Sequence, residues 1–200
     1  MTDFVTRFRA HPRPDRKVTH LSDSRPPAEL THRELDRRAR AVAAWLTGSA
    51  PEGAPVLLLY PAGLDFLVAF LGCLYARVVA VPAPLPLSGA SRADRVERLL
   101  ADSGARMVLT DEAHVAVLGD LSARTFEETA VPDAGEPLRA PDPDTVAYLQ
   151  YTSGSTSVPR GVEVTHGNLT HNLEVFGRVS GDVPVRRIGG WLPHHHDMGL

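Results

Sequence analysis

Cysteine and long apolar runs are scarce in this sequence, and each absence excludes a class of protein. Cys73 is the only cysteine, which excludes an intrachain disulfide and a CxxC metal site and predicts a buried core thiol. The most apolar stretch, residues 56–81, is interrupted by Pro61, Asp65 and Arg77. No uninterrupted apolar span within it comes near the roughly 17 residues that a membrane-spanning helix needs, and we expect a buried core segment.

Basic charge is neither in excess nor clustered. The net charge is −3 and the pI is near 6.3, which gives no electrostatic footprint for nucleic acid. Small molecules or proteins are the better partners. The N-terminus has no apolar stretch, so neither a secretory signal nor a membrane anchor is expected, and we predict a cytoplasmic location. Lys17 is the only lysine, against 20 arginines.

The chain begins with residues that lack periodicity. Residues 1–27 are rich in Arg, Pro and Asp, which predicts an extended leader. An amphipathic helix is then expected, because Thr31 and Glu34 have the spacing of a capping box and apolar residues follow at helical intervals until Gly48.

Strands and helices are expected to alternate beyond this point. Residues 55–60 and 78–81 are typical of buried strands and residues 65–76 of a buried helix, which predicts a βαβ crossover. A helix capped by Ser91 and Asp94 and a strand over residues 106–110 come next, and residues 125–143 have the composition of a surface linker. The pattern is that of an α/β fold.

A stretch rich in hydroxyl groups and glycine lies between two further predicted strands, residues 145–150 and 162–165. Residues 151–161 read YTSGSTSVPRG, and such a loop lets backbone N–H groups and hydroxyls approach phosphate oxygens. It is not a Walker A loop, because no G-K-(S/T) follows at the required spacing and a strand follows in place of a helix. A Ser/Thr-rich surface loop is the alternative.

This stretch resembles the phosphate-binding motif of the adenylate-forming superfamily, Y-T-S-G-(S/T)-T-G-x-P-K-G, with Ser157 in place of Gly and Arg160 in place of Lys. Residues 190–200, GWLPHHHDMGL, resemble the W-L-P-x-x-H-D-M-G-L motif of the fatty-acyl-AMP ligase branch. The resemblance covers about residues 30–200. It implies that residues 28–200 are the N-terminal part of the AMP-binding domain, a partial large N-terminal domain in which mixed and parallel sheets are covered by helices.

The resemblance also implies roles for individual residues. His196 and Asp197 would line the region where the acyl carboxylate meets the α-phosphate, and Thr156 would be catalytic and a Mg²⁺ ligand. Trp191 and Met198 would shape the acyl entrance or belong to the core, and we expect a core position for Trp191. The residues that would bind the ATP phosphates are Thr152, Ser153, Gly154, Ser155, Thr156, Ser157, Arg160 and Gly161.

The remaining histidines have simpler interpretations. A metal site at His194, His195 and His196 is disfavoured, because adjacent side chains of an extended segment point to opposite faces and at most His194 and His196 converge. We expect three further histidines to be solvated or related to helix caps, namely His32, His166 and His171.

The implied reaction is attack of a fatty-acid carboxylate on the α-phosphate of ATP with Mg²⁺ as cofactor, followed by transfer of the acyl group to a carrier-protein phosphopantetheine thiol. Three alternatives stay open: an acyl-CoA ligase that uses coenzyme A, an amino-acid-activating domain, and a nucleotide-binding fragment without turnover. The family's catalytic lysine comes from a C-terminal lid, and Lys17 lies in the leader. We therefore expect these 200 residues alone not to catalyse adenylation at a useful rate.

Overall fold

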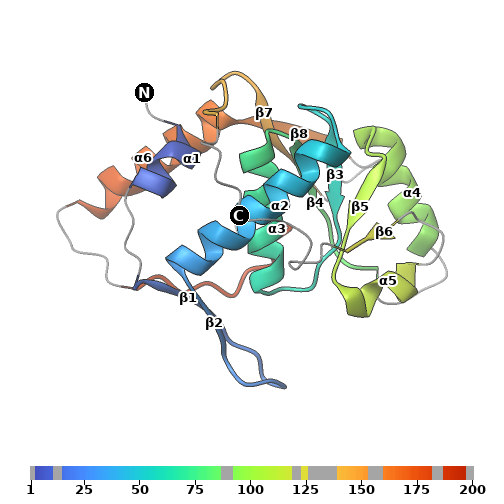
Figure 1. The fold of residues 1–200 in the computed structure, drawn as a ribbon, viewed down its shortest axis with the longest axis horizontal. Helices are drawn as coiled ribbons and strands as arrows, with labels where there is room; N and C mark the ends of the chain where they lie inside the picture. Colours follow the sequence, from blue (N-terminus) through green and yellow to red (C-terminus); the bar gives the residue numbers. More distant parts are fainter. Residues whose placement is uncertain are drawn as a thin grey trace.

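The computed structural model describes residues 3–10, 15–86, 92–118, 123–125, 139–152, 160–181 and 187–196, which form interleaved helices and strands (Figure 1). The helices are α1 (Phe4–Ala10), α2 (His32–Ser49), α3 (Leu64–Ala76), α4 (Arg92–Ser103), α5 (Glu112–Leu118) and α6 (His166–Ser180). The strands are β1 (Lys17–His20), β2 (Ala28–Thr31), β3 (Pro55–Leu58), β4 (Val79–Pro82), β5 (Met107–Leu109), β6 (Ala123–Arg124), β7 (Val146–Thr152) and β8 (Arg160–Thr165).

Six of the strands form one mixed sheet in the order β6-β5-β3-β4-β7-β8. Neighbouring strands from β6 to β7 are parallel, whereas β8 runs antiparallel to β7. Helix α3 joins the parallel neighbours β3 and β4, so the predicted βαβ crossover is confirmed. The predicted α/β class with a mixed sheet covered by helices is confirmed as well.

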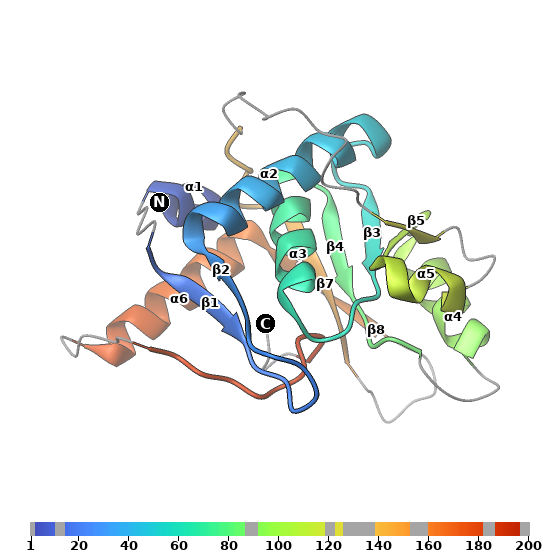
Figure 2. The same cartoon turned by 60° about the horizontal axis from the view of Figure 1, so that its bottom comes forward.

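Helices cover both faces of this sheet, with α2 and α3 on one side and α4 and α5 on the other (Figures 1 and 2). Successive side chains of β3 divide between the two cores. Val56 and Leu58 join the cluster beneath α2 and α3, while Leu57 and Leu59 join the cluster that includes Leu99 of α4. Because strand side chains alternate in direction, a strand buried on both faces must be apolar throughout, as β3 is.

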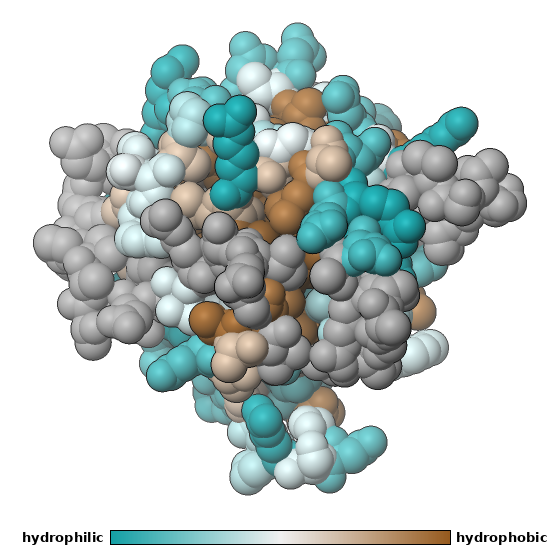
Figure 3. Space-filling model, turned by 90° about the vertical axis from the view of Figure 1, so that its right-hand side faces the viewer, coloured by the Kyte–Doolittle hydropathy of each residue, from teal (hydrophilic) through white to brown (hydrophobic). Residues whose placement is uncertain are grey.

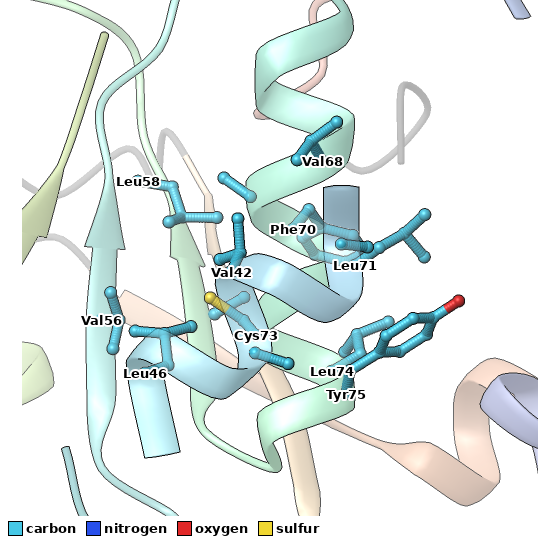
Figure 4. Packing of buried hydrophobic residues seen from close by; sticks show 14 of the residues in the cluster. Val42, Leu46, Val56, Leu58, Val68, Phe70, Leu71, Cys73, Leu74 and Tyr75 are labelled. Atoms are coloured by element: carbon cyan, nitrogen blue, oxygen red, sulfur yellow. The ribbon is translucent and has the colours of Figure 1, made fainter. Parts of the chain in front are cut away.

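Helix α3 is buried on nearly all sides. Figure 4 shows Cys73 beside Val42 and Leu46 of α2, with Val56 of β3 close by and Leu74 on the other side of the helix next to Tyr75. The predicted core thiol is confirmed, and burial raises the pKa of Cys73. In the described part of the chain, no helix is long and apolar enough to cross a membrane.

The end of α3 adopts an unusual backbone conformation. Arg77 caps the helix with φ 56° and ψ 34°, the left-handed region that favours glycine. Its guanidinium donates two hydrogen bonds, of 2.8 and 2.7 Å, to the carboxylate of Glu52. This bidentate ion pair holds the loop before β3 against the end of α3.

The two longest helices, α2 and α6, each begin with a capping box. The Thr31 hydroxyl accepts a hydrogen bond from the Glu34 N–H, while the Glu34 carboxylate accepts one from the Thr31 N–H. The predicted start of α2 is therefore confirmed, and the helix extends one residue beyond Gly48. Thr165 and Asn168 form the same reciprocal pair at α6.

The prediction of an extended leader is wrong for residues 4–10, which form α1. The Asp3 carboxylate accepts a hydrogen bond from the Thr6 N–H and so caps the helix, and Val5 is buried. Later in the leader, β1 pairs antiparallel with β2, so this part is a strand within a ribbon. The boundary between leader and domain at residue 28 stays a prediction.

Close packing of α2 and α3 generates a stability prediction. A Cβ atom at Gly72 would lie 2.4 Å from Val42 Cγ1, well inside van der Waals contact. We expect Gly72→Ala to lower the free energy of unfolding by about 1–3 kcal/mol, because the helices must separate or repack. Combining it with Val42→Ala should recover part of that loss, and urea unfolding of the single and double variants measures this coupling.

Gly177→Ala in α6 is the matched control, since a Cβ atom there meets no atom within 4 Å. We expect it to stabilise the helix by about 0.5–1 kcal/mol through the usual alanine preference. An equal loss of stability at both positions would contradict the close-packing explanation.

Candidate functional site

The hydroxyl-rich stretch is carried by a hairpin. Strands β7 and β8 pair antiparallel, with Tyr151 opposite Gly161 and Thr152 opposite Arg160. The predicted strand on each side of the stretch is confirmed, and so is the prediction that a strand rather than a helix follows it. Residues 153–159 lie outside the described residues, and with them Ser153, Gly154, Ser155, Thr156 and Ser157.

Strand β7 of the hairpin ends at the carboxyl edge of the parallel strands. Ala80 of β4 pairs with Tyr148 of β7, and the two strands run in the same direction. The stretch at the end of β7 therefore leaves the sheet at the same edge as the loops that follow β3, β4 and β5. In open α/β sheets this is the edge at which ligands bind.

A buried amide joins the second motif to the hairpin. Gln150, 5% exposed, donates a hydrogen bond of 2.8 Å from Nε2 to the backbone oxygen of His195. The His194 ring lies against Phe66 in the first turn of α3, with ring centroids 3.9 Å apart. The end of β7 is thus held against the turn at residues 193–196, although 45 residues separate Gln150 from His195.

Residues 193–196 form a turn in which the His196 N–H donates to the Pro193 oxygen at 2.9 Å. The sequence-based expectation of an extended segment is therefore wrong here, since proline favours a turn start. The rings of His194 and His195 meet edge to face at 5.4 Å. Among the described residues, no group of three or more His, Cys, Asp or Glu side chains is placed to hold a metal ion.

Comparison with known proteins decides the family, because the model of the AMP-binding enzymes matches residues 7–200. The chain belongs to the AMP-binding enzyme family. JamA, a medium-chain fatty acid–acyl carrier protein ligase of Moorena producens (strain JHB), is 40% identical over 189 residues, which are 86% of this chain and 31% of that protein. A Mycobacterium leprae (strain TN) relative with the provisional name fatty-acid–CoA ligase is 36% identical over 188 residues, 86% of this chain and 32% of the relative.

Solved structures agree with this assignment. The fatty acyl-adenylate ligase from L. pneumophila, in complex with acyl adenylate and pyrophosphate, superposes with a TM-score of 0.81 at 33% identity. The match covers 98% of this chain and 36% of that one. This AMP-binding chain therefore spans about a third of the length of the relatives it matches.

Only part of the site expected from the sequence can be located on this AMP-binding fold. Thr152 ends β7, while Arg160 is exposed and Gly161 partly exposed at the start of β8. His196 is exposed at the end of the turn. Asp197 and Met198 lie outside the described residues. Sequence reasoning missed Gln150, although a polar residue in an otherwise apolar strand is a signal that could have identified it.

The expectation for Trp191 is corrected, and of the two alternatives for His166 the one next to a helix cap holds. Trp191 is 91% exposed and does not lie in the core: residues 187–193 form neither helix nor strand and do not bring this side chain against the sheet. His166 is 1% exposed rather than solvated, because it directly follows the Thr165 cap and the start of α6 packs beneath residues 143–145. Burial lowers the pKa of His166.

Three buried polar atoms in this region have no hydrogen-bond partner within the described residues. They are Gln150 Oε1, His194 Nε2 and His195 Nδ1. Burial and, to a smaller extent, the adjacent His195 lower the pKa of His194 from 6.5 to about 4. Burial also lowers the pKa of His195, with Arg95 and His196 acting in the same direction. His194 is therefore uncharged at neutral pH.

Acidification should weaken the fold through His194. A histidine with a lowered pKa contributes its full stability above pH 6.5 and loses it as the pH falls towards 4, because only the unfolded chain then binds the proton freely. Since His194 is partly solvent-exposed, we expect a loss of about 1–2 kcal/mol between pH 7.5 and pH 4.5, measured by urea unfolding.

His194→Phe keeps a ring against Phe66 but removes the titrating group, so its stability should depend less on pH. His166 and His195 should supply the dependence that remains, because their pKa values are lowered as well. An identical pH profile for His194→Phe and the wild type would contradict the assignment to His194.

Proposed function

We propose that this chain forms the phosphate-binding part of an ATP-dependent ligase that activates a fatty acid as acyl-adenylate. The observation that supports the proposal is the hydrogen bond between Gln150 and His195, which joins the end of β7, directly before residues 151–161, to the turn at residues 193–196. The names of the relatives support the reaction class.

Different residues near the hairpin would bind the phosphates and neutralise their charge. Residues 152–157 and Gly161 would offer hydroxyls and backbone N–H groups to the phosphates, and Arg160 would supply positive charge. The exposed guanidinium at the base of the hairpin fits this role, because its fork can pair with two phosphate oxygens. Mg²⁺ supplies further neutralisation of phosphate charge when bound, and Thr156 would be its ligand.

The chemistry is an in-line displacement followed by acyl transfer. A carboxylate oxygen of the fatty acid forms a bond to the α-phosphorus as the bond to the β-phosphate oxygen breaks, and pyrophosphate leaves. His196 and Asp197 would orient the carboxylate for this attack. A thiolate then attacks the acyl carbonyl carbon and AMP departs.

Two acceptors fit this second step. We propose the phosphopantetheine thiol of an acyl carrier protein, in keeping with the carrier-protein ligase JamA. Coenzyme A is the second candidate, in keeping with the relative provisionally named a fatty-acid–CoA ligase. Both acceptors present the same thiol arm, so only the protein or nucleotide attached to it distinguishes them.

Pyrophosphate release by the full-length protein tests the proposal. With ATP and Mg²⁺, we expect release that depends on added fatty acid, and transfer of the acyl group to a phosphopantetheinylated carrier protein in preference to coenzyme A. Release that is the same with and without fatty acid would refute the acid-activating function. Preferential transfer to coenzyme A would instead select the second acceptor.

Arg160 provides a prediction within this function. Arg160→Ala should raise the KM for ATP by about ten-fold, equivalent to ~1.4 kcal/mol, because a charge-assisted contact to phosphate is lost. Arg160→Lys should recover part of the loss, since the charge returns without the planar fork. Arg178→Ala on α6 is the control for removal of an exposed arginine and should leave the KM unchanged. A normal KM in Arg160→Ala would exclude Arg160 from phosphate binding.

A further inference from the structure

Tyr151 links the hairpin to a helix on the other side of the sheet from α3. Its hydroxyl donates a hydrogen bond of 2.6 Å to Oδ2 of Asp102 in the last turn of α4. The two residues are 49 positions apart in the sequence, and the Tyr151 ring packs against the cluster that includes Val96 and Leu99. The side chain therefore spans from the last pairs of the hairpin to α4.

The same ring lies across the facing strand at Gly161. A Cβ atom at Gly161 would be 3.1 Å from Tyr151 Cζ and 3.3 Å from Tyr151 Oη. Glycine leaves the space that an aromatic ring fills when it crosses an antiparallel pair. The absence of a side chain at Gly161 thus makes room for the Tyr151 ring. It would also allow the backbone of residue 161 to approach a phosphate.

Asp102 occupies a position where a carboxylate is unfavourable on its own. The C-terminal turn of a helix carries partial negative charge, which disfavours an acidic side chain. The hydrogen bond from Tyr151 offsets this cost. Burial and the bond to Asp102 raise the pKa of Tyr151, so the phenol keeps its proton and remains the donor.

The end of α4 that presents Asp102 is itself fixed. The Ser103 hydroxyl donates to the Leu99 oxygen at 2.6 Å and accepts from the Ala105 N–H at 3.2 Å, which closes the last turn of the helix. Gly104 follows with φ 71°, a conformation that glycine adopts without strain. The backbone that carries Asp102 is therefore held by these bonds, although the Asp102 side chain itself is exposed.

We propose that Tyr151 is a positioning residue, which sets the place of the phosphate-binding stretch by lying across Gly161 and bonding to Asp102. The pair of Thr152 and Arg160 comes directly after the pair of Tyr151 and Gly161, so the tyrosine fixes the last point before residues 153–159. This inference rests on the proposed function. It assigns to Tyr151 a role in binding the nucleotide without contact to it.

The test compares Tyr151→Phe with a variant that loses the same kind of bond elsewhere. Tyr151→Phe keeps the ring over Gly161 and removes only the hydroxyl. We expect the KM for ATP of the full-length protein to rise about three- to ten-fold, as for loss of one hydrogen bond, while the KM for fatty acid changes less than about two-fold. A fall in melting temperature should accompany this change.

Tyr75→Phe is the matched control. The Tyr75 hydroxyl donates to Oδ1 of Asp36 at 2.8 Å and joins the last turn of α3 to α2, at the opposite end of α3 from Phe66. It should lower the melting temperature comparably while leaving the KM for ATP at the wild-type value. A separate check uses Asp102: Asp102→Asn retains an acceptor and should behave as wild type, whereas Asp102→Ala should reproduce Tyr151→Phe.

The outcomes separate this inference from the proposed function. A wild-type protein that shows no fatty-acid-dependent pyrophosphate release overturns the function and with it the role of Tyr151. A wild-type protein that is active, with an unchanged KM for ATP in both Tyr151→Phe and Asp102→Ala, overturns only the positioning role. If Tyr151→Phe fails to fold, the comparison of Asp102→Ala with Asp102→Asn decides the question alone.

Discussion

Burial of α3 on nearly all sides is the constraint on which the rest of the structure depends. A helix that is apolar all round needs partners on all of its surface, and α2 and the sheet supply them. The parallel strands β3 and β4 follow from this arrangement, because the chain enters and leaves α3 through neighbouring strands. The first turn of α3, with Phe66, is thereby placed at the carboxyl edge of the sheet.

That edge then collects groups from distant parts of the chain. β7 adds beside β4, and its polar Gln150 is buried where an apolar residue would be expected. An unpaired buried amide costs about 1–3 kcal/mol, so the bond to the His195 oxygen offsets only part of the cost while Oε1 remains without a partner in the described residues. The local departure from apolar patterning coincides with the proposed site, as is common where function competes with stability.

The sequence predicted the features that depend on near neighbours. The capping box at Thr31, the crossover over residues 55–81 and the strands flanking the hydroxyl-rich stretch each have a signal within a few residues, and all are confirmed. Helix α1 was missed, and its ion pair of 3.2 Å from Arg7 to Glu174 joins residues 167 positions apart. Periodicity carries no information about such contacts.

The candidate site was likewise predictable only in its local features, because its long-range contacts leave no signal in the sequence. Its motifs are local strings and could be identified, but the bonds that place them, from Gln150 to His195 and from Tyr151 to Asp102, are long-range. The exposure of Trp191 was likewise beyond sequence reasoning, because apolar character alone predicts burial. The sequence predicted an extended segment at His194, His195 and His196, whereas these residues lie in a turn that begins at Pro193.

Stability and the proposed chemistry are supported by different parts of the molecule. Most of the fully buried apolar side chains lie in α2, α3 and the strands β5, β3 and β4, whereas α6 exposes Phe176 and Val179. On the side that carries α4 and α5, hydrophilic residues border a strip of apolar surface (Figure 3). The hairpin of β7 and β8 is intermediate in burial, because Gln150 of β7 is buried and Val162 of β8 is half exposed.

A hairpin with little apolar burial of its own depends on individual polar bonds for its position. The bond from Tyr151 to Asp102 is a small fraction of the total stability, yet it acts one strand pair before the end of the hairpin, next to the stretch that we propose to bind phosphate. Displacement of reacting groups by about 1 Å is enough to slow a reaction by two orders of magnitude. Polar bonds at the edge of the core therefore act on the position of the proposed site, whereas the much larger apolar burial beneath α3 acts through the stability of the fold that carries it.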